Sequence, residues 1–167
     1  MKFYFDGACG PKNDGTGDMG IGVVLYHNVQ NVKLFEKALH VPYTAKYETL
    51  NYGRTSFQYK DTSNNLAEHL ALFHVLRKLY SLNVPNKLAK VHIFGDSKMV
   101  INQMKGYFKI NDGNPYSQVA KRNKFILDNH LNDHNIIFEW IPRENNSAAD
   151  ELSKLGCVKK LSFEKTF

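Results

Sequence analysis

Apolar and polar residues alternate over residues 2–8, and this period of two predicts a strand at the start of the chain. The alternation is clearest at Phe3 and Phe5, whose neighbours are Tyr4 and Asp6. A loop rich in glycine follows at 10–20. The expected strands cover residues 2–8, 21–26 and 32–41. Three consecutive strands joined by turn-rich loops indicate an antiparallel meander.

From Leu66 to Tyr80 the apolar residues recur every three to four positions, which is the pattern of one face of a helix. The expected helices lie around 66–80, 100–104, 116–131 and 147–155, and two further strands lie at 90–96 and 136–141. Gly156 is expected just past the end of the last helix. The segment 42–62 has no clean period, so it either extends the third strand or forms a hairpin flap. This order of elements predicts an α/β fold, with a mixed sheet and helices on its faces.

The chain has 167 residues, which favours one domain at 1–156 followed by a tail at 157–167. A hydrophobic content of 43% and a charged content of 23% are globular values and exclude disorder. No apolar run approaches the length of a membrane span, and Asp6 comes too early for a signal peptide. Two cysteines, Cys9 and Cys157, are too few for a disulfide framework, so we expect a cytoplasmic protein.

The balance of charge indicates a class of partner. The 22 lysines and arginines outnumber the 16 acidic residues, and the net charge of +6 favours a polyanion. Much of the excess lies in 98–124, which contains one acidic residue. The basic residues there are Lys98, Lys105, Lys109, Lys121, Arg122 and Lys124. A solvated basic surface is the alternative explanation.

Four acidic residues stand at the boundaries of predicted elements: Asp6, Glu68, Asp96 and Asp150. Helix capping explains three of them. Asn65 with Glu68 fits a capping box, and Ser147 with Asp150 is a weaker version of that pattern. Asp96 is placed to cap the short helix that follows it. Taken singly, capping is the stronger explanation for each of the three.

Asp6 resists such an explanation, because it lies between apolar residues in a strand that we expect to be central. Burying an unpaired carboxylate is costly, so Asp6 calls for a cation. Asp96 falls at the carboxyl end of a strand, where open sheets bind ligands. Clustered carboxylates suit Mg²⁺, which prefers oxygen ligands. The seven histidines are scattered and show no zinc spacing.

The segments that hold these acids resemble the motifs of the type 1 ribonuclease H family. They are 5–9 (FDGAC), 64–68 (NNLAE), 94–97 (FGDS) and 140–150 (WIPRENNSAAD). They occur in the family's order on matching elements, and the resemblance covers nearly the whole chain. It implies a ribonuclease H-like five-stranded mixed sheet, in which three antiparallel strands precede two parallel ones. The catalytic domain would be 1–156, with 42–62 as an insertion or flap.

The resemblance also implies an activity, namely endonucleolytic hydrolysis of the RNA strand of RNA–DNA hybrids, leaving 5′-phosphate and 3′-hydroxyl ends. Two Mg²⁺ ions would serve this reaction, with Mn²⁺ able to substitute. The metal-binding and catalytic carboxylates implied for this chain are Asp6, Glu68, Asp96 and Asp150. The expected partner is the hybrid, bound by a monomer that needs no membrane and no obligate protein partner.

Substrate contacts follow from the same resemblance. Cys9, Asn13, Asn64 and Asn65 would read the 2′-hydroxyls of the RNA strand. Helix capping is the alternative role of the paired asparagines. Ser63 occupies the place of a threonine that grips a phosphate of the DNA strand. Lys98, Lys105 and Lys109 are expected to contact substrate phosphates.

Two departures from the best-studied members point to a branch of the family. Residues 142–149 contain no histidine, so the role of the family's mobile loop histidine passes to Arg143, whose alternative is an ordinary surface arginine. The interval between Asp96 and Asp150 leaves no room for the extra basic helix that many members use. The basic residues of 98–124 are expected to compensate.

Three other functions remain open at this point. The first is another nuclease of the same fold, such as a junction resolvase or an exonuclease. The second is a non-catalytic module that binds RNA–DNA hybrids. The third is a structural or interaction protein, which would leave Asp6 unexplained.

Overall fold

The computed structural model describes residues 1–167 except 11–14, 44–47, 53–54 and 60, and for 48–52 and 55–59 the description is confined to the backbone. Six strands form one mixed sheet in the order β7-β6-β1-β2-β3-β8. They are β1 (Lys2–Gly10), β2 (Asp18–Tyr26), β3 (Lys33–Val41), β6 (Lys90–Gly95), β7 (Asn135–Trp140) and β8 (Phe163–Thr166). β6 runs parallel to β1 and β7, and the other neighbouring pairs are antiparallel.

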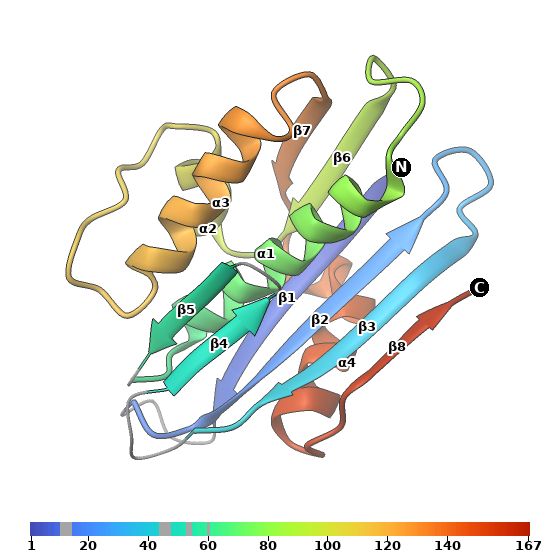
Figure 1. The fold of residues 1–167 in the computed structure, drawn as a ribbon. Coiled ribbons are helices and arrows are strands. Elements are labelled where there is room, and N and C mark those ends of the chain that lie inside the picture. Colours follow the sequence, from blue (N-terminus) through green and yellow to red (C-terminus); the bar gives the residue numbers. More distant parts are fainter. Residues whose placement is uncertain (11–14, 44–47, 53–54, 60) are drawn as a thin grey trace.

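Helices cover both faces of this sheet (Figure 1). The helices are α1 (Asn64–Leu82), α2 (Lys98–Met104), α3 (Ser117–Asn129) and α4 (Ser147–Cys157), with a 3₁₀ turn at Arg143–Asn145. α1 packs on β1 and β2 from one side, and α3 packs on α1. α4 packs on β1, β2 and β3 from the other side. Within the described residues, none of the helices is long and apolar enough to cross a membrane.

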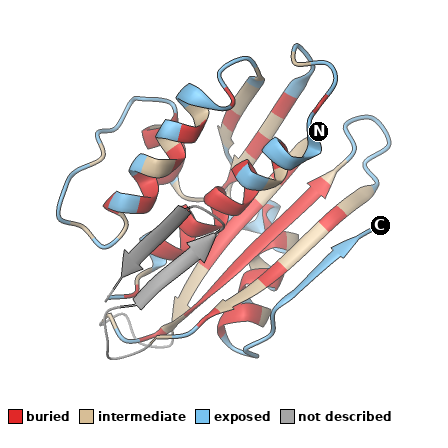
Figure 2. Cartoon of the chain, in the orientation of Figure 1, coloured by how far each residue is buried: buried red, intermediate tan, exposed pale blue. Residues whose placement is uncertain are grey.

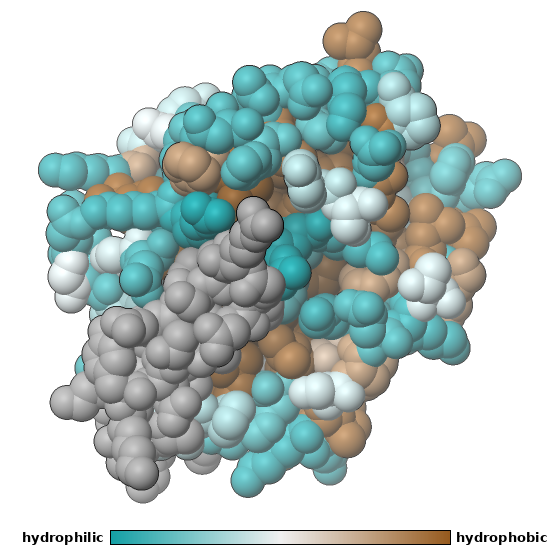
Figure 3. Space-filling model, in the orientation of Figure 1, coloured by the Kyte–Doolittle hydropathy of each residue, from teal (hydrophilic) through white to brown (hydrophobic). Residues whose placement is uncertain are grey.

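The core lies mainly between α1 and the sheet, where the buried residues of Figure 2 concentrate on β1, β2 and α1. Phe3, Phe5 and Phe73 are among its largest side chains. A smaller cluster forms where Leu152 of α4 packs on Val24 of β2 and Ala38 of β3. In the view of Figure 3 the surface carries hydrophilic residues interrupted by small hydrophobic areas. The larger cluster thus holds α1 against one face of the sheet, and the smaller one holds α4 against β2 and β3 on the other face.

The predicted α/β fold is confirmed, with its meander of three antiparallel strands and its two parallel strands. The sheet has a sixth strand, however, because part of the expected tail forms β8 and pairs with β3. β1 and β2 also extend further than expected, since their pairing continues to Gly10 opposite Asp18. The predicted loop at 10–20 is therefore shorter.

The segment 42–62 forms a hairpin, which is one of the two alternatives expected for it. β4 (Glu48–Tyr52) and β5 (Thr55–Tyr59) pair in an antiparallel, two-stranded sheet of their own. β3 ends at Val41, so the hairpin does not extend it.

The placement of Gly156 past the end of α4 is wrong, because the helix continues to Cys157. Gly156 serves close packing instead. A Cβ at this position would overlap the backbone carbonyl of Leu39, and it would also press on the Cα of Gly20. The residue is glycine because α4 lies directly on the backbones of β2 and β3.

The same close approach recurs at three glycines of the central strands. A Cβ at Gly7 would overlap the backbone of Ala67 in α1. A Cβ at Gly20 or Gly22 would overlap the carbonyl oxygen of Ser153 or Ala149 in α4. The two helices therefore contact β1 and β2 at backbone distance from opposite faces.

Gly20→Ala should lower the free energy of unfolding by about 1–3 kcal/mol, because the new methyl group must push α4 away from the sheet. The measurement is urea unfolding followed by circular dichroism. Gly10→Ala is the matched control on the neighbouring strand, since its Cβ would meet no atom within 4 Å. We expect the control to change stability by less than about 1 kcal/mol. Equal unfolding midpoints for the two variants would contradict close packing at Gly20.

Candidate active site

Three carboxylates from different elements converge at one place in the molecule. Asp6 lies in β1, Glu68 in the second turn of α1, and Asp96 directly after β6. One oxygen of each carboxylate lies within 4.8 Å of the other two. Asp6 and Glu68 are only 3% and 7% exposed. The structure thus brings together three of the four acids that the sequence singled out.

Helix capping does not account for these acids. The Ser63 hydroxyl caps α1, because it accepts a hydrogen bond of 3.0 Å from the backbone N–H three residues on. Ser97 caps α2 in the same way, at 3.3 Å. The predicted capping box of Asn65 with Glu68 is therefore wrong, as is the cap at Asp96. Both carboxylates are left for another role.

Burial makes the cluster electrostatically unfavourable when it is fully charged. Burial raises the pKa of Asp6 to about 6, and the charge of Asp96 acts in the same direction. Burial and the charge of Asp6 raise the pKa of Glu68 well above its ordinary value. Oε2 of Glu68 is buried without a hydrogen-bond partner within the described part of the chain. This buried cluster offers only oxygen atoms as metal ligands, and one of them has no hydrogen-bond partner. Such a site fits a hard divalent cation.

Side chains outside the predicted set hold these carboxylates in place. The Ser153 hydroxyl donates to Oδ2 of Asp6 at 3.0 Å. Nδ2 of Asn146 donates to Oδ2 of Asp96 at 3.1 Å and to the carbonyl of Phe5 at 2.9 Å. The Trp140 indole donates to the carbonyl of Asp96 at 3.0 Å. Asn146 and Trp140 stand in a motif segment, but nothing in their spacing indicates these bonds.

Asp150 lies at the start of α4, outside the group of three. It accepts hydrogen bonds from Arg143 at 3.3 Å and from Lys154 at 2.9 Å. Partial burial would raise the pKa of Asp150, but the hydrogen bonds and charges of Lys154 and Arg143 hold it below its ordinary value. Asp150 is therefore a charged carboxylate that forms ion pairs with both Arg143 and Lys154.

A groove of about 790 Å³ opens over the cluster. Its lining includes Asp6, Glu68, Asp96, Cys9, Asn64, Asn65, Arg143, Lys154, Cys157 and Lys160. The backbone N–H of Cys9 donates to Oδ1 of Asn64 at 2.9 Å, which joins the end of β1 to the start of α1. The predicted contacts Cys9, Asn64 and Asn65 thus share a groove with the carboxylates. Ser63 adjoins this lining as the cap of α1, and Asn13 lies outside the described residues.

The predicted basic contacts lie elsewhere. Lys98 is exposed, with its ammonium 4.6 Å from the centre of the Trp140 ring. Lys105 and Lys109 are exposed on the loop after α2. Lys121 is paired with Asp112, and Lys124 lies 3.7 Å from Asp128. Among the described residues that line the groove, none belongs to 98–124.

The chain is similar in sequence to a known protein family. Residues 49–156, which are well over half of the chain, match the reverse transcriptase-like family. The chain belongs to this family. The match spans Glu68, Asp96 and Asp150 together with the elements that carry them.

Solved structures of type 1 ribonuclease H are similar over almost the whole chain. A ribonuclease H1 isolated from compost by a metagenomic approach is 29% identical, covers 96% of this chain and 97% of its own, and superposes with a TM-score of 0.66. A structure of this enzyme in complex with an RNA/DNA hybrid gives 27% identity, 96% and 99% coverage and a TM-score of 0.64. Ribonuclease H1 from the halophilic archaeon Halobacterium salinarum is 21% identical, with 93% and 95% coverage and a TM-score of 0.64. The resemblance to type 1 ribonuclease H is confirmed.

Asp6→Asn should raise the thermal stability of the metal-free protein, because it removes one charge from a buried acidic cluster. The folded-state pKa lies near 6 against an ordinary value of 3.8, so the ionised form costs folding free energy on the order of 3 kcal/mol. This cost is complete above about pH 6 and disappears as the pH falls toward 3.8.

The measurement is thermal unfolding in EDTA at pH 7.5 and at pH 4.5 (both about one unit or more from the folded pKa). Glu151→Gln, which removes an exposed carboxylate of α4, serves as the control. An equal gain for Asp6→Asn at both pH values would show that charge in the cluster is not the cause.

Proposed function

We propose that this chain is a divalent-metal-dependent ribonuclease H that hydrolyses the RNA strand of RNA–DNA hybrids endonucleolytically and leaves 5′-phosphate and 3′-hydroxyl ends. The observation that carries the proposal is the convergence of Asp6, Glu68 and Asp96 in a groove, within a chain of this family. The similar compost enzyme in complex with an RNA/DNA hybrid supports the choice of substrate.

The carboxylates of Asp6, Glu68, Asp96 and Asp150 would hold the metal. Two Mg²⁺ ions, or Mn²⁺ in their place, would supply activation of the attacking water and stabilisation of the leaving 3′ oxygen. Ser153 and Asn146 orient Asp6 and Asp96, so these oxygens need little reorganisation when a cation binds. Because the first three acids repel one another when ionised, a bound cation would also relieve a cost of folding.

Arg143 would act on the phosphate rather than on the metal. It lies 3.3 Å from Asp150, and its guanidinium remains charged at any working pH. It cannot serve as a general base, so its role would be electrostatic: to stabilise charge on the scissile phosphate or to help the product leave.

The part of the groove lined by Cys9, Asn64 and Asn65 would distinguish RNA from DNA. These three residues would read 2′-hydroxyl groups of the RNA strand. Asn13 is proposed for the same role on the family resemblance alone. Ser63 would grip a phosphate of the DNA strand. Lys98, Lys105 and Lys109 would contact phosphates further from the reaction centre, where they add affinity but no sequence preference. A monomer would suffice for this binding mode.

The proposal is tested with end-labelled RNA–DNA hybrid, duplex RNA, duplex DNA and single strands, each with Mg²⁺ and with EDTA. Cleavage should be confined to the RNA of the hybrid and should need the metal. Asp96→Asn should reduce cleavage by more than about 10²-fold, while the circular dichroism spectrum stays that of the wild type. Equal cleavage of duplex DNA would favour another nuclease of the same fold. Hybrid binding without cleavage would favour a binding module.

Arg143→Ala should lower turnover by about 10²–10³-fold and change hybrid binding much less, because the lost donor acts mainly on charge that develops in the transition state. Arg143→Lys should restore part of the turnover, since it keeps the charge but not the planar geometry. Single-turnover kinetics together with equilibrium binding separate the two effects. Glu144→Gln, an exposed neighbour in the same 3₁₀ turn, is the control. Unchanged turnover in Arg143→Ala would remove Arg143 from the mechanism.

A further inference from the structure

Lys160 stands in a backbone conformation that lysine rarely adopts. Its φ of 56° lies in the left-handed region, which favours glycine, and it lies just beyond the end of α4. The chain reverses direction here to enter β8. Glycine would fit this turn with less strain, so the presence of a long cationic side chain calls for an explanation other than folding.

Hydrogen bonds hold the residues that follow Lys160 against α4 and β3. The N–H of Leu161 donates to the carbonyl of Leu155 at 3.1 Å, which joins the turn to α4. The backbone N–H of His40 donates to the Ser162 hydroxyl at 2.9 Å, which joins the turn to β3. These bonds fix the point from which the Lys160 side chain starts.

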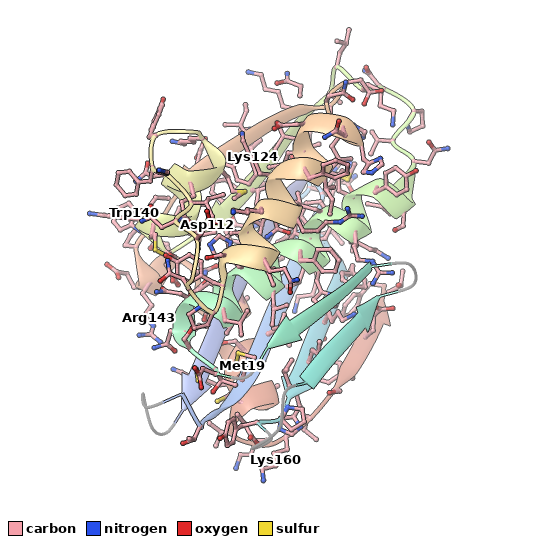
Figure 4. The ribbon with its side chains drawn as sticks, turned by 60° about the vertical axis from the view of Figure 1, so that its left-hand side comes forward. Met19, Asp112, Lys124, Trp140, Arg143 and Lys160 are labelled. Carbon is pink, nitrogen blue, oxygen red and sulfur yellow. The ribbon has the colours of Figure 1, made fainter. Side chains whose placement is uncertain are left out.

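Lys160 lines the same groove as the carboxylates. It interacts electrostatically with Asp18, which pairs with Gly10 and whose carbonyl accepts a hydrogen bond from Sγ of Cys157, so Lys160 lies at the end of the groove lined by Gly10 and Cys157. Among the described residues that line the groove there are two further cations, Arg143 and Lys154, and both pair with Asp150. Figure 4 shows Arg143 and Lys160 well apart, with Met19 between them in that view. Lys160 therefore carries charge to a part of the groove that the other two cations do not serve.

No carboxylate of the described residues forms an ion pair with Lys160 within 4.0 Å. Asp18 is an acid close enough to interact with it electrostatically. The carboxylate of Asp18 is already held by Nε2 of His40 and by the backbone N–H of Tyr43, both at 2.9 Å. The charge of Lys160 is thus available to a ligand.

We propose that Lys160 binds a phosphate of the RNA strand beside the part of the groove lined by Cys9. This inference rests on the proposed function, and it adds a contact at the carboxyl end of α4 that the four family motifs do not contain. Cys9 and Asn64 would face 2′-hydroxyls of the RNA strand. Gly10 follows Cys9 in β1, so a cation at the end of the groove lined by Gly10 would meet the backbone of that same strand. The contact would extend the footprint of the protein beyond the reaction centre.

The experiment compares Lys160→Gly with Lys159→Gln. Both variants remove one positive charge from the same turn, but Lys159 does not line the groove. Lys160→Arg keeps the charge. Binding of a fluorescently labelled RNA–DNA hybrid is measured by anisotropy in EDTA across 50–200 mM salt, and the melting temperature and hybrid cleavage of every variant are recorded.

Lys160→Gly should reduce the slope of log affinity against log salt by about 0.7–0.9, the value of one phosphate contact. Its affinity deficit should accordingly shrink about threefold between 50 and 200 mM salt. Lys159→Gln and Lys160→Arg should keep the wild-type slope. The melting temperature of Lys160→Gly should equal or exceed that of the wild type, because glycine suits the left-handed turn, so a folding defect cannot imitate the result.

Equal slopes for Lys160→Gly and Lys159→Gln would overturn the proposal. A hybrid with neutral methylphosphonate linkages in the RNA strand should abolish the difference between these variants, whereas the same linkages in the DNA strand should preserve it. The opposite pattern would also overturn the assignment to the RNA strand. Failure of the wild type to cleave the hybrid would refute the proposed function instead, and the binding slopes would still decide the role of Lys160.

Discussion

Backbone contact between two helices and the central strands brings Glu68 and Ser153 to opposite sides of Asp6. α1 and α4 pack on opposite faces of β1 and β2 at positions that must be glycine. Gly7 follows Asp6 directly and admits the backbone of α1, which brings Glu68 to the edge of β1. Gly20 and Gly22 admit α4, which brings Ser153 to the other side of Asp6. A wider separation at either face would take the polar groups out of reach of one another.

This packing places acidic side chains close together in a buried site, where their negative charges repel one another. Asp6 and Glu68 are buried together, although two carboxylates in one place favour protonation over charge. The hydroxyl of Ser153 donates to Asp6 and the amide of Asn146 donates to Asp96, and neither donor introduces a countercharge. Two cations that line the groove, Arg143 and Lys154, pair with Asp150 instead. The three-carboxylate cluster therefore keeps a strong preference for an added cation, at a cost to the stability of the metal-free fold.

The sequence predicted the order of the elements and the positions of Asp6, Glu68 and Asp96, because periodicity and strand ends are local properties. It did not predict β8, since a four-residue strand with every position exposed has no alternation of burial to reveal it. The function of Gly156 was also hidden: a glycine near a helix end resembles a stop signal, and only tertiary contact with Leu39 shows that the helix continues through it. The predicted caps at Asn65 and Asp96 were also wrong: Ser63 caps α1 two residues earlier, and Ser97 caps α2 one residue later. Several residues at each helix start could serve as a cap, and only the backbone geometry decides which one does.

The pairing of β8 with β3 has a consequence for the association of this protein with other chains. Without β8, the N–H and C=O groups along the outer edge of β3 would form an open template for strands of neighbouring molecules. β8 covers this edge with a short strand that carries Glu164 and Lys165, and its outer side is too brief and too charged to recruit a further strand readily. We therefore expect β8 to disfavour edge-to-edge aggregation. The turn that leads into β8 also places Lys160 in the groove.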